Sequence, residues 1–236
     1  SGAATSTGRV RKVNQDAYLD RADLGLWAVA DGMGGHSDGD RASRLLVERL
    51  ARMGHQSLLG AGVEASRKTL REVNEQLLRD AVDLGRDLIG STIVALVAVG
   101  DHGAILWVGD SRAYRFRQGK LSQLTSDHTQ VQEMVARGLL SPEQAKYHPL
   151  SNVLASAVGG DRELAVDCQI EAFRDGDRFL LCSDGLDKEL ETDQIARLLS
   201  AFEPAQSAQA LVDSACDAGG RDNVTALVVD IYHYPS

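Results

Sequence analysis

The sequence predicts an α+β fold, a four-layer α-β-β-α sandwich of two mostly antiparallel sheets flanked by helical pairs. One observation is the segment Ile93–Val99, which is apolar at successive positions, so a strand there needs cover on both of its faces. A second is the helical spacing of Leu70, Val73 and Leu77, which gives that segment one apolar face to bury. Stacked sheets with helices on their outer faces satisfy both requirements.

The predicted elements follow one another as strands interrupted by two helical pairs. Apolar and β-branched runs predict strands over residues 16–19, 26–30, 91–99, 104–108, 113–117, 121–124, 166–173, 178–182 and 224–232. Helical periodicity predicts one pair of helices over residues 40–53 and 64–84, and another over 193–199 and 205–218. Turn sequences with glycine at residues 100–103, 118–119 and 175–177 predict hairpins, and hairpins make neighbouring strands antiparallel.

Length and composition indicate a single domain over residues 1–236. Hydrophobic residues make up 43% of the 236 positions, and no proline-rich or single-sign charged stretch divides the chain. The net charge of −9 argues against binding to nucleic acid. The longest apolar run is too short to span a bilayer and the N-terminus lacks a signal pattern, so we expect a cytoplasmic protein without membrane insertion.

Four aspartates lie at the ends of predicted hydrophobic strands. Asp31 follows LWAVA, Asp110 follows ILWVG, Asp184 follows FLLCS, and Asp222 precedes NVTALVVDIY. Any one of them alone is typical of a turn. If packed strands bring the four together, their carboxylates repel one another unless a cation joins them. An all-oxygen set favours Mg²⁺, Mn²⁺ or Ca²⁺ over zinc, and the loop pattern of an EF-hand is absent.

Two neighbouring features suggest what such a site could do. Gly32 has no side chain, so its backbone carbonyl could approach a metal ion. Two ions about 4 Å apart would deprotonate a bridging water for in-line attack on phosphorus. Arg11 offers a bidentate grip on phosphate, although Arg9, Arg11 and Lys12 could equally be a solvated basic face.

The ordered motifs GRVRKVNQDA, VADGMGGHSDGDRAS, GSTIVALV, WVGDSRAYR, LTSDHTQVQEMVARG, LLCSDGLDKEL and GGRDNVTALVV resemble those of the metal-dependent serine/threonine protein phosphatases of type 2C. The resemblance runs from about residue 8 to about residue 232 and implies the same sandwich, with a dinuclear Mn²⁺ or Mg²⁺ site at one edge of the sheets. It also implies that residues from about 129 to about 158 form a flap beside the cleft.

The resemblance assigns roles to the residues that match the motifs. Asp31 would bridge both metals and Gly32 would donate its carbonyl to the second, while Asp184 and Asp222 would bind the first. Asp16 would orient metal-bound waters, and Arg11 would hold the phosphate. Asp110 would serve a third, weaker-binding metal ion.

Two positions depart from the family pattern. Where relatives usually carry an acid four residues after the SDGL aspartate, this chain has Lys188, with Asp187 one residue earlier. A lysine there would repel a third cation or pair with Asp110. Where animal relatives have a candidate general acid, this chain has Met33, as in bacterial relatives. His36 lies nearby as an alternative, and a loop histidine is more often solvated than catalytic.

The function predicted from these residues is hydrolysis of phosphoserine and phosphothreonine in proteins by direct water attack, opposing a serine/threonine kinase. The expected partners are phosphorylated protein substrates and that kinase pathway. A cysteine phosphatase is disfavoured because Cys182 and Cys216 lack the C-x5-R spacing. A phosphoprotein-binding scaffold of the same fold is the alternative, and it would be favoured by loss of a metal-binding aspartate.

Overall fold

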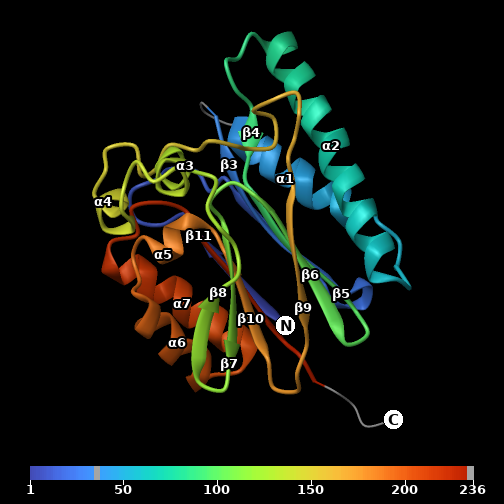
Figure 1. Cartoon of the computed structure of the whole chain (residues 1–236), viewed down its shortest axis with the longest axis vertical. Helices are drawn as coiled ribbons and strands as arrows, with labels where there is room; N and C mark the ends of the chain where they lie inside the picture. The colour runs from blue at the N-terminus through green and yellow to red at the C-terminus, as the bar shows by residue number, and fades with distance from the viewer. Residues whose placement is uncertain (35–37, 233–236) are drawn as a thin grey trace.

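The computed structural model, which describes residues 1–34 and 38–232, has the predicted four layers. A five-stranded sheet in the order β1-β11-β10-β7-β8 packs on a six-stranded sheet in the order β2-β3-β5-β6-β9, with β4 paired to β3. The helices α1 and α2 lie outside the second sheet, and α6 and α7 lie outside the first (Figure 1). Neighbouring strands in both sheets pair antiparallel, as the hairpin sequences predict.

The bounds of the elements differ from the predicted ranges mostly by a few residues. The strands are β1 Gly2–Ser6, β2 Asp16–Arg21, β3 Leu26–Met33, β4 Gly90–Ser91, β5 Ile93–Val99, β6 His102–Val108, β7 Arg112–Arg117, β8 Lys120–Gln123, β9 Asp167–Ala172, β10 Arg178–Cys182 and β11 Val224–Asp230. The helices are η1 Ala22–Leu24, α1 Asp38–Ala51, α2 Leu59–Leu84, α3 Gln130–Ala136, α4 Pro142–Lys146, α5 Asp184–Asp187, α6 Thr192–Ala201 and α7 Pro204–Ala218.

Three hydrophobic clusters hold the layers together. Between the sheets, Val29 and Leu96 of one meet Phe179 and Leu227 of the other. Beneath α1 and α2, Leu46 and similar aliphatic side chains pack on the outer face of the six-stranded sheet. A third cluster joins α6 and α7 to the five-stranded sheet. The apolar run of β5 is therefore covered on both faces, which confirms the reason for predicting a sandwich.

Two buried ion pairs involve alternate arginines of β7, which lie on the same face of the strand. Arg115 contacts Glu171 of β9, and so joins an element of one sheet to an element of the other. Arg117 donates two hydrogen bonds of 2.5 Å to the two carboxylate oxygens of Asp177. Since Asp177 is only 1% exposed, this paired arrangement is what makes burial of its charge tolerable.

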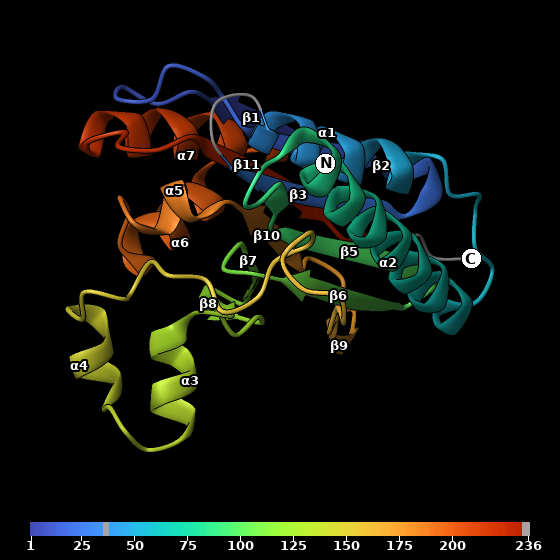
Figure 2. The same cartoon turned by 90° about the horizontal axis from the view of Figure 1, so that it is seen from above.

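Several elements were not predicted. The sequence GAATS has no apolar alternation, yet β1 pairs with β11 along its whole length. Residues 91–99 form β4 and β5 with Thr92 between them, and β3 continues to Met33 because Gly32 and Met33 pair with β4. The short helices α3 and α4 project from the body of the sandwich in the region of the predicted flap (Figure 2). Among the described residues, no helix has the length and apolarity needed to cross a membrane.

Candidate metal centre

One cavity of about 630 Å³ collects most of the predicted site residues. It lies where β3 ends and β11 begins, and its walls come from β3 and from segments that flank strands of both sheets. The predicted residues that line it are Arg11, Asp31, Gly32, Asp110, Asp184 and Asp222. The structure thus brings together residues that are up to 211 positions apart in the chain. His36 falls outside the described residues.

Asp16 lies beside the cavity, buried to 7% exposure and paired with Asp31 across β2 and β3. Its Oδ2 accepts hydrogen bonds of 2.7 Å from the hydroxyls of Ser183 and Thr225, whereas its Oδ1 is buried without a partner. The two hydroxyls come from the ends of β10 and β11, so the opposite sheet orients this carboxylate. Ser183 and Thr225 were not predicted as site residues, because a single hydroxyl in a strand has no distinctive sequence pattern.

Asp31 lies inside β3, whereas the sequence analysis had placed it just after the end of that strand. Its backbone N–H donates to Oγ1 of Thr92 at 3.1 Å, and its carbonyl accepts from the Thr92 N–H at 2.8 Å. The same Thr92 hydroxyl lies 2.7 Å from the hydroxyl of Ser111, next to Asp110. Thr92 therefore ties the strand that carries Asp31 to the loop that carries Asp110, a role that sequence reasoning missed.

Gly32 has a steric reason for being glycine. A Cβ at this position would lie 2.0 Å from the carbonyl oxygen of Gly39 and 2.8 Å from that of Gln15. Both contacts are with backbone, so a side chain could be accommodated only by moving α1 or the segment before β2. The close packing of β3 on α1 thus demands glycine, whether or not its carbonyl also binds a metal.

Asp184 and Asp222 each contact a cation of the chain itself. Oδ2 of Asp184 accepts from Nζ of Lys188, while its Oδ1 is buried without a partner. Oδ2 of Asp222 accepts from Arg11 at 2.8 Å. Lys188 therefore pairs with Asp184, and not with Asp110 as one of the two sequence alternatives had it, because the turn of α5 sets residues 184 and 188 side by side.

The carboxylates around the cavity strongly disfavour one another's charge. Burial raises the pKa of Asp31 well above its ordinary value, and Asp16 and Asp184 raise it further. Burial raises the pKa of Asp16 to about 7, against the opposing effect of its two hydroxyl partners. Burial and the charge of Asp184 also raise the pKa of Asp110 to about 7, whereas the charge of Lys188 lowers it. Such a cluster is a place where bound cations would relieve repulsion.

The residues present fit a pair of hard divalent cations. The donors are carboxylates and a backbone carbonyl, which suit Mg²⁺ and Mn²⁺, and two buried oxygens, Asp16 Oδ1 and Asp184 Oδ1, lack partners. In the part of the chain that is described, no three His, Cys, Asp or Glu side chains already converge on one point. Arg11 and Lys188 each contact only Oδ2 of their carboxylate, and Oδ1 of Asp184 has no hydrogen-bond partner.

The cysteines do not form a phosphate-binding site. Cys182 is fully buried in β10, and burial raises the pKa of its thiol well above the ordinary value. Cys168 stands six residues before Arg174, a C-x5-R spacing that was missed in the sequence, but Cys168 lies in the extended strand β9. A phosphate loop needs its backbone N–H groups turned towards one point, which a paired strand does not provide.

Comparison with known proteins gives concordant matches. A family model described as protein phosphatase 2C matches residues 5–215. The serine/threonine protein phosphatase PstP of Mycobacterium tuberculosis is 36% identical over 98% of this chain, which spans 45% of that protein. The serine/threonine phosphatase stp of Listeria monocytogenes is 35% identical over 96% of this chain and 93% of its own length. The solved catalytic domain of PstP in complex with two manganese ions is 33% identical, with a TM-score of 0.87 over 98% of this chain and 97% of that one.

Proposed function

The chain belongs to the protein phosphatase 2C family, as a serine/threonine protein phosphatase of the bacterial PPM type, and we propose that it hydrolyses phosphoserine and phosphothreonine in proteins by direct attack of water. The observation that carries the proposal is the single cavity that unites Arg11, Asp31, Asp184 and Asp222. We further propose that the protein opposes a serine/threonine kinase, since such a kinase produces the phosphorylated side chains that it would act on.

Two divalent cations, Mn²⁺ or Mg²⁺, are the cofactors that this site fits. The carboxylates of Asp31, Asp184 and Asp222 and the carbonyl of Gly32 are the groups that would hold them. When bound, such ions supply an activated water and neutralise charge on the phosphoryl group. Relatedness to a phosphatase domain solved with two manganese ions supports this choice.

Arg11 is the group proposed to bind the phosphate. Its side chain is 55% exposed at the cavity wall, and its Nη2 donates to Oδ2 of Asp222. A guanidinium presents several N–H donors in one plane, so Arg11 can contact Asp222 and still direct donors at two phosphate oxygens. This anchoring would orient the phosphorus for in-line attack.

Asp16 is proposed to orient water in the site. Ser183 and Thr225 fix one of its carboxylate oxygens, which leaves the other buried and free of hydrogen-bond partners from the protein. A carboxylate held in this way accepts a hydrogen bond from water in a set direction, and so reduces the entropy lost on reaching the reactive geometry.

A phosphothreonine peptide assay with and without added Mn²⁺ tests the proposal. We expect metal-dependent release of phosphate from the unaltered protein and its loss in the Asp31→Asn variant. The control is Asp83→Asn, the same change at an exposed position of α2. Binding of the peptide without turnover at any Mn²⁺ concentration would overturn the proposed hydrolysis and favour the scaffold function.

A further inference from the structure

We propose that Lys188 is the resident cation of the pocket beside the metal centre, so that this chain binds two divalent ions and excludes the third that its family resemblance implies. The inference rests on the proposed function for the two ions of the main centre. It concerns a separate hollow of about 380 Å³, which shares Asp110, Asp184 and Lys188 with the main cavity.

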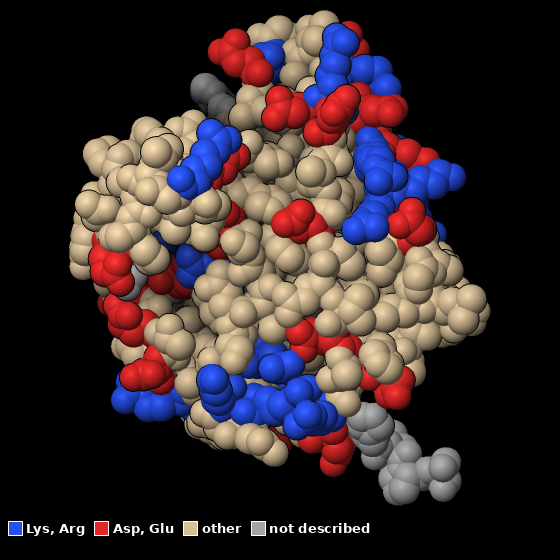
Figure 3. Space-filling model, viewed as in Figure 1, with Lys and Arg blue, Asp and Glu red and all other residues tan. Residues whose placement is uncertain are grey.

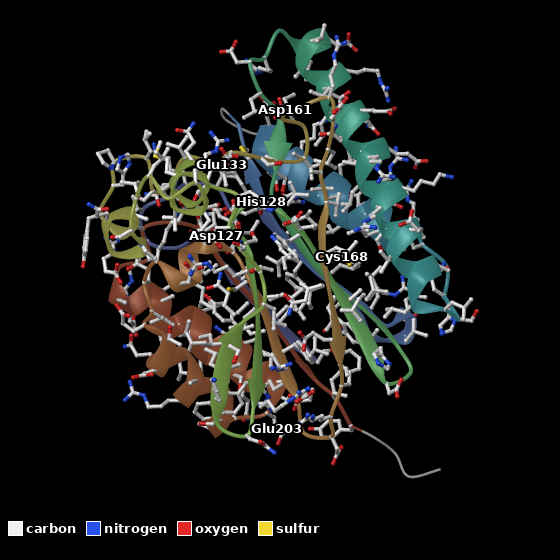
Figure 4. The ribbon with its side chains drawn as sticks, viewed as in Figure 1. Asp127, His128, Glu133, Asp161, Cys168 and Glu203 are labelled. Atoms are coloured by element: carbon white, nitrogen blue, oxygen red, sulfur yellow. The ribbon has the colours of Figure 1, made fainter. Side chains whose placement is uncertain are left out.

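The second pocket carries an unusual density of charge. Its charged lining consists of four aspartates and two basic side chains: Asp110, Asp127, Asp184, Asp187, Arg112 and Lys188. Residues of the α3–α4 region complete the lining. In the space-filling view, blue and red atoms meet in the hollow below α3 and α4 (Figure 3). Figure 4 places Asp127 at the base of the segment that leads into α3.

Arg112 forms ion pairs with both aspartates on the far side of this pocket. Its Nε and Nη2 donate to the carboxylate of Asp127 at 2.9 and 2.7 Å. Its Nη1 lies 2.8 Å from Oδ2 of Asp187, which is buried to 8% side-chain exposure. A further cation that approached either carboxylate would meet the positive charge of this guanidinium.

Lys188 supplies the positive charge on the near side of the pocket. Its ammonium contacts Oδ2 of Asp184, and its charge also favours ionisation of Asp110. A lysine side chain is charged at neutral pH, so the part of the pocket that these two carboxylates line already holds a positive group. A divalent ion brought into that space would meet repulsion from Lys188 and would gain no carboxylate that is free of a basic partner except Asp110.

The arrangement also has a consequence for Asp184 itself. Because Lys188 takes Oδ2 and Oδ1 has no partner, the side chain presents one oxygen for the ions of the main centre and keeps the other engaged. An intrachain ammonium does this at every metal concentration, whereas a weakly bound third ion would do so only at high concentration. Lys188 is accordingly a positioning residue.

The number of bound Mn²⁺ ions tests the inference. Titration calorimetry, together with the EPR signal of free Mn²⁺, should count two ions in the unaltered chain and three in K188D, where the repelling charge becomes a ligand. The matched control is K68D, which makes the same charge reversal in an exposed i,i+4 pair of α2 and should bind two. Two ions in K188D, or three in the unaltered chain, would overturn the inference.

A second variant keeps the test decisive if K188D does not fold. D110N should leave the count at two, because Asp110 holds no third ion when Lys188 is present. A fall from three ions to two in D110N would instead identify Asp110 as a third-metal ligand and overturn the inference. Phosphopeptide turnover is scored separately: two bound ions without turnover would refute the proposed function alone, and turnover with three ions would refute this inference alone.

Discussion

Replacement of Thr92 by valine tests whether this hydroxyl holds the metal centre in register. Thr92 Oγ1 is the partner of both the Asp31 N–H, at 3.1 Å, and the Ser111 hydroxyl, at 2.7 Å. Valine keeps the volume and removes the hydroxyl, so both partners lose a bond within a site where Thr92 and Ser111 are 2% and 1% exposed.

The magnitude follows from the two partners that are left unsatisfied. Each buried polar group without a hydrogen bond costs about 1–3 kcal/mol, so with two such groups the free energy of unfolding should fall by about 2–6 kcal/mol. The Mn²⁺ concentration for half-maximal activity should rise, and a tenfold rise would correspond to about 1.4 kcal/mol of lost ion binding. Urea unfolding measures the first quantity and phosphopeptide turnover the second.

Two companion variants separate the hydrogen bonds from the packing. Thr92→Ser keeps the hydroxyl and loses a methyl group, with an expected cost of about 1 kcal/mol. Thr92→Val combined with Ser111→Ala should lose less stability than the two single changes added together, because it removes both members of one bond. If the free energies of unfolding of Thr92→Val and Thr92→Ser differ by less than about 0.5 kcal/mol, the argument that the hydroxyl joins β3 to the loop of Asp110 is wrong.

Two further predictions concern packing and pH. Gly32→Ala should lower the free energy of unfolding by about 1–3 kcal/mol or prevent folding, because its Cβ would meet backbone at 2.0 Å. The control Gly60→Ala in α2, where a Cβ would have nothing within 4 Å, should raise the free energy of unfolding by about 0.4–1 kcal/mol. Equal urea midpoints for the two variants would refute this prediction. The pKa of Asp177 is lowered, since its bonds to Arg117 and to the Arg174 N–H outweigh the effect of burial. The contribution of Asp177 to stability is therefore present above the unfolded pKa of about 3.9 and is lost as the pH falls through the lower folded pKa. In Asp177→Asn the free energy of unfolding should consequently decrease less steeply below about pH 4 than in the unaltered chain.

The layers of the fold could be predicted from sequence because they depend on periodic apolar patterns. The run in β5 and the apolar faces of α1 and α2 each require a specific kind of cover, and a sandwich provides it. By contrast, β1 is stabilised by pairing with β11, a contact across more than two hundred residues that the sequence GAATS does not encode locally.

The site was predictable to the extent that its residues have distinctive chemistry. Asp31, Asp184 and Asp222 stand out as acids beside apolar strands, and they do line one cavity. The hydroxyls of Thr92 and Thr225 do not stand out, because their importance depends on which strand faces them. Likewise, the partner of Lys188 depended on the unpredicted helix α5, which places Asp184 one turn away.

Because the residues of the metal centre are divided between the two sheets, the centre can form only when the sheets have docked. Asp16 and Asp31 belong to the six-stranded sheet, whereas Asp184 and Asp222 flank β10 and β11 of the other. β11 is the last strand in the described chain and lies between β1 and β10, so the centre is complete only after this late segment inserts. A partly folded chain with both sheets formed but undocked would lack the full set of ligands, and capture of the ions would mark the end of assembly.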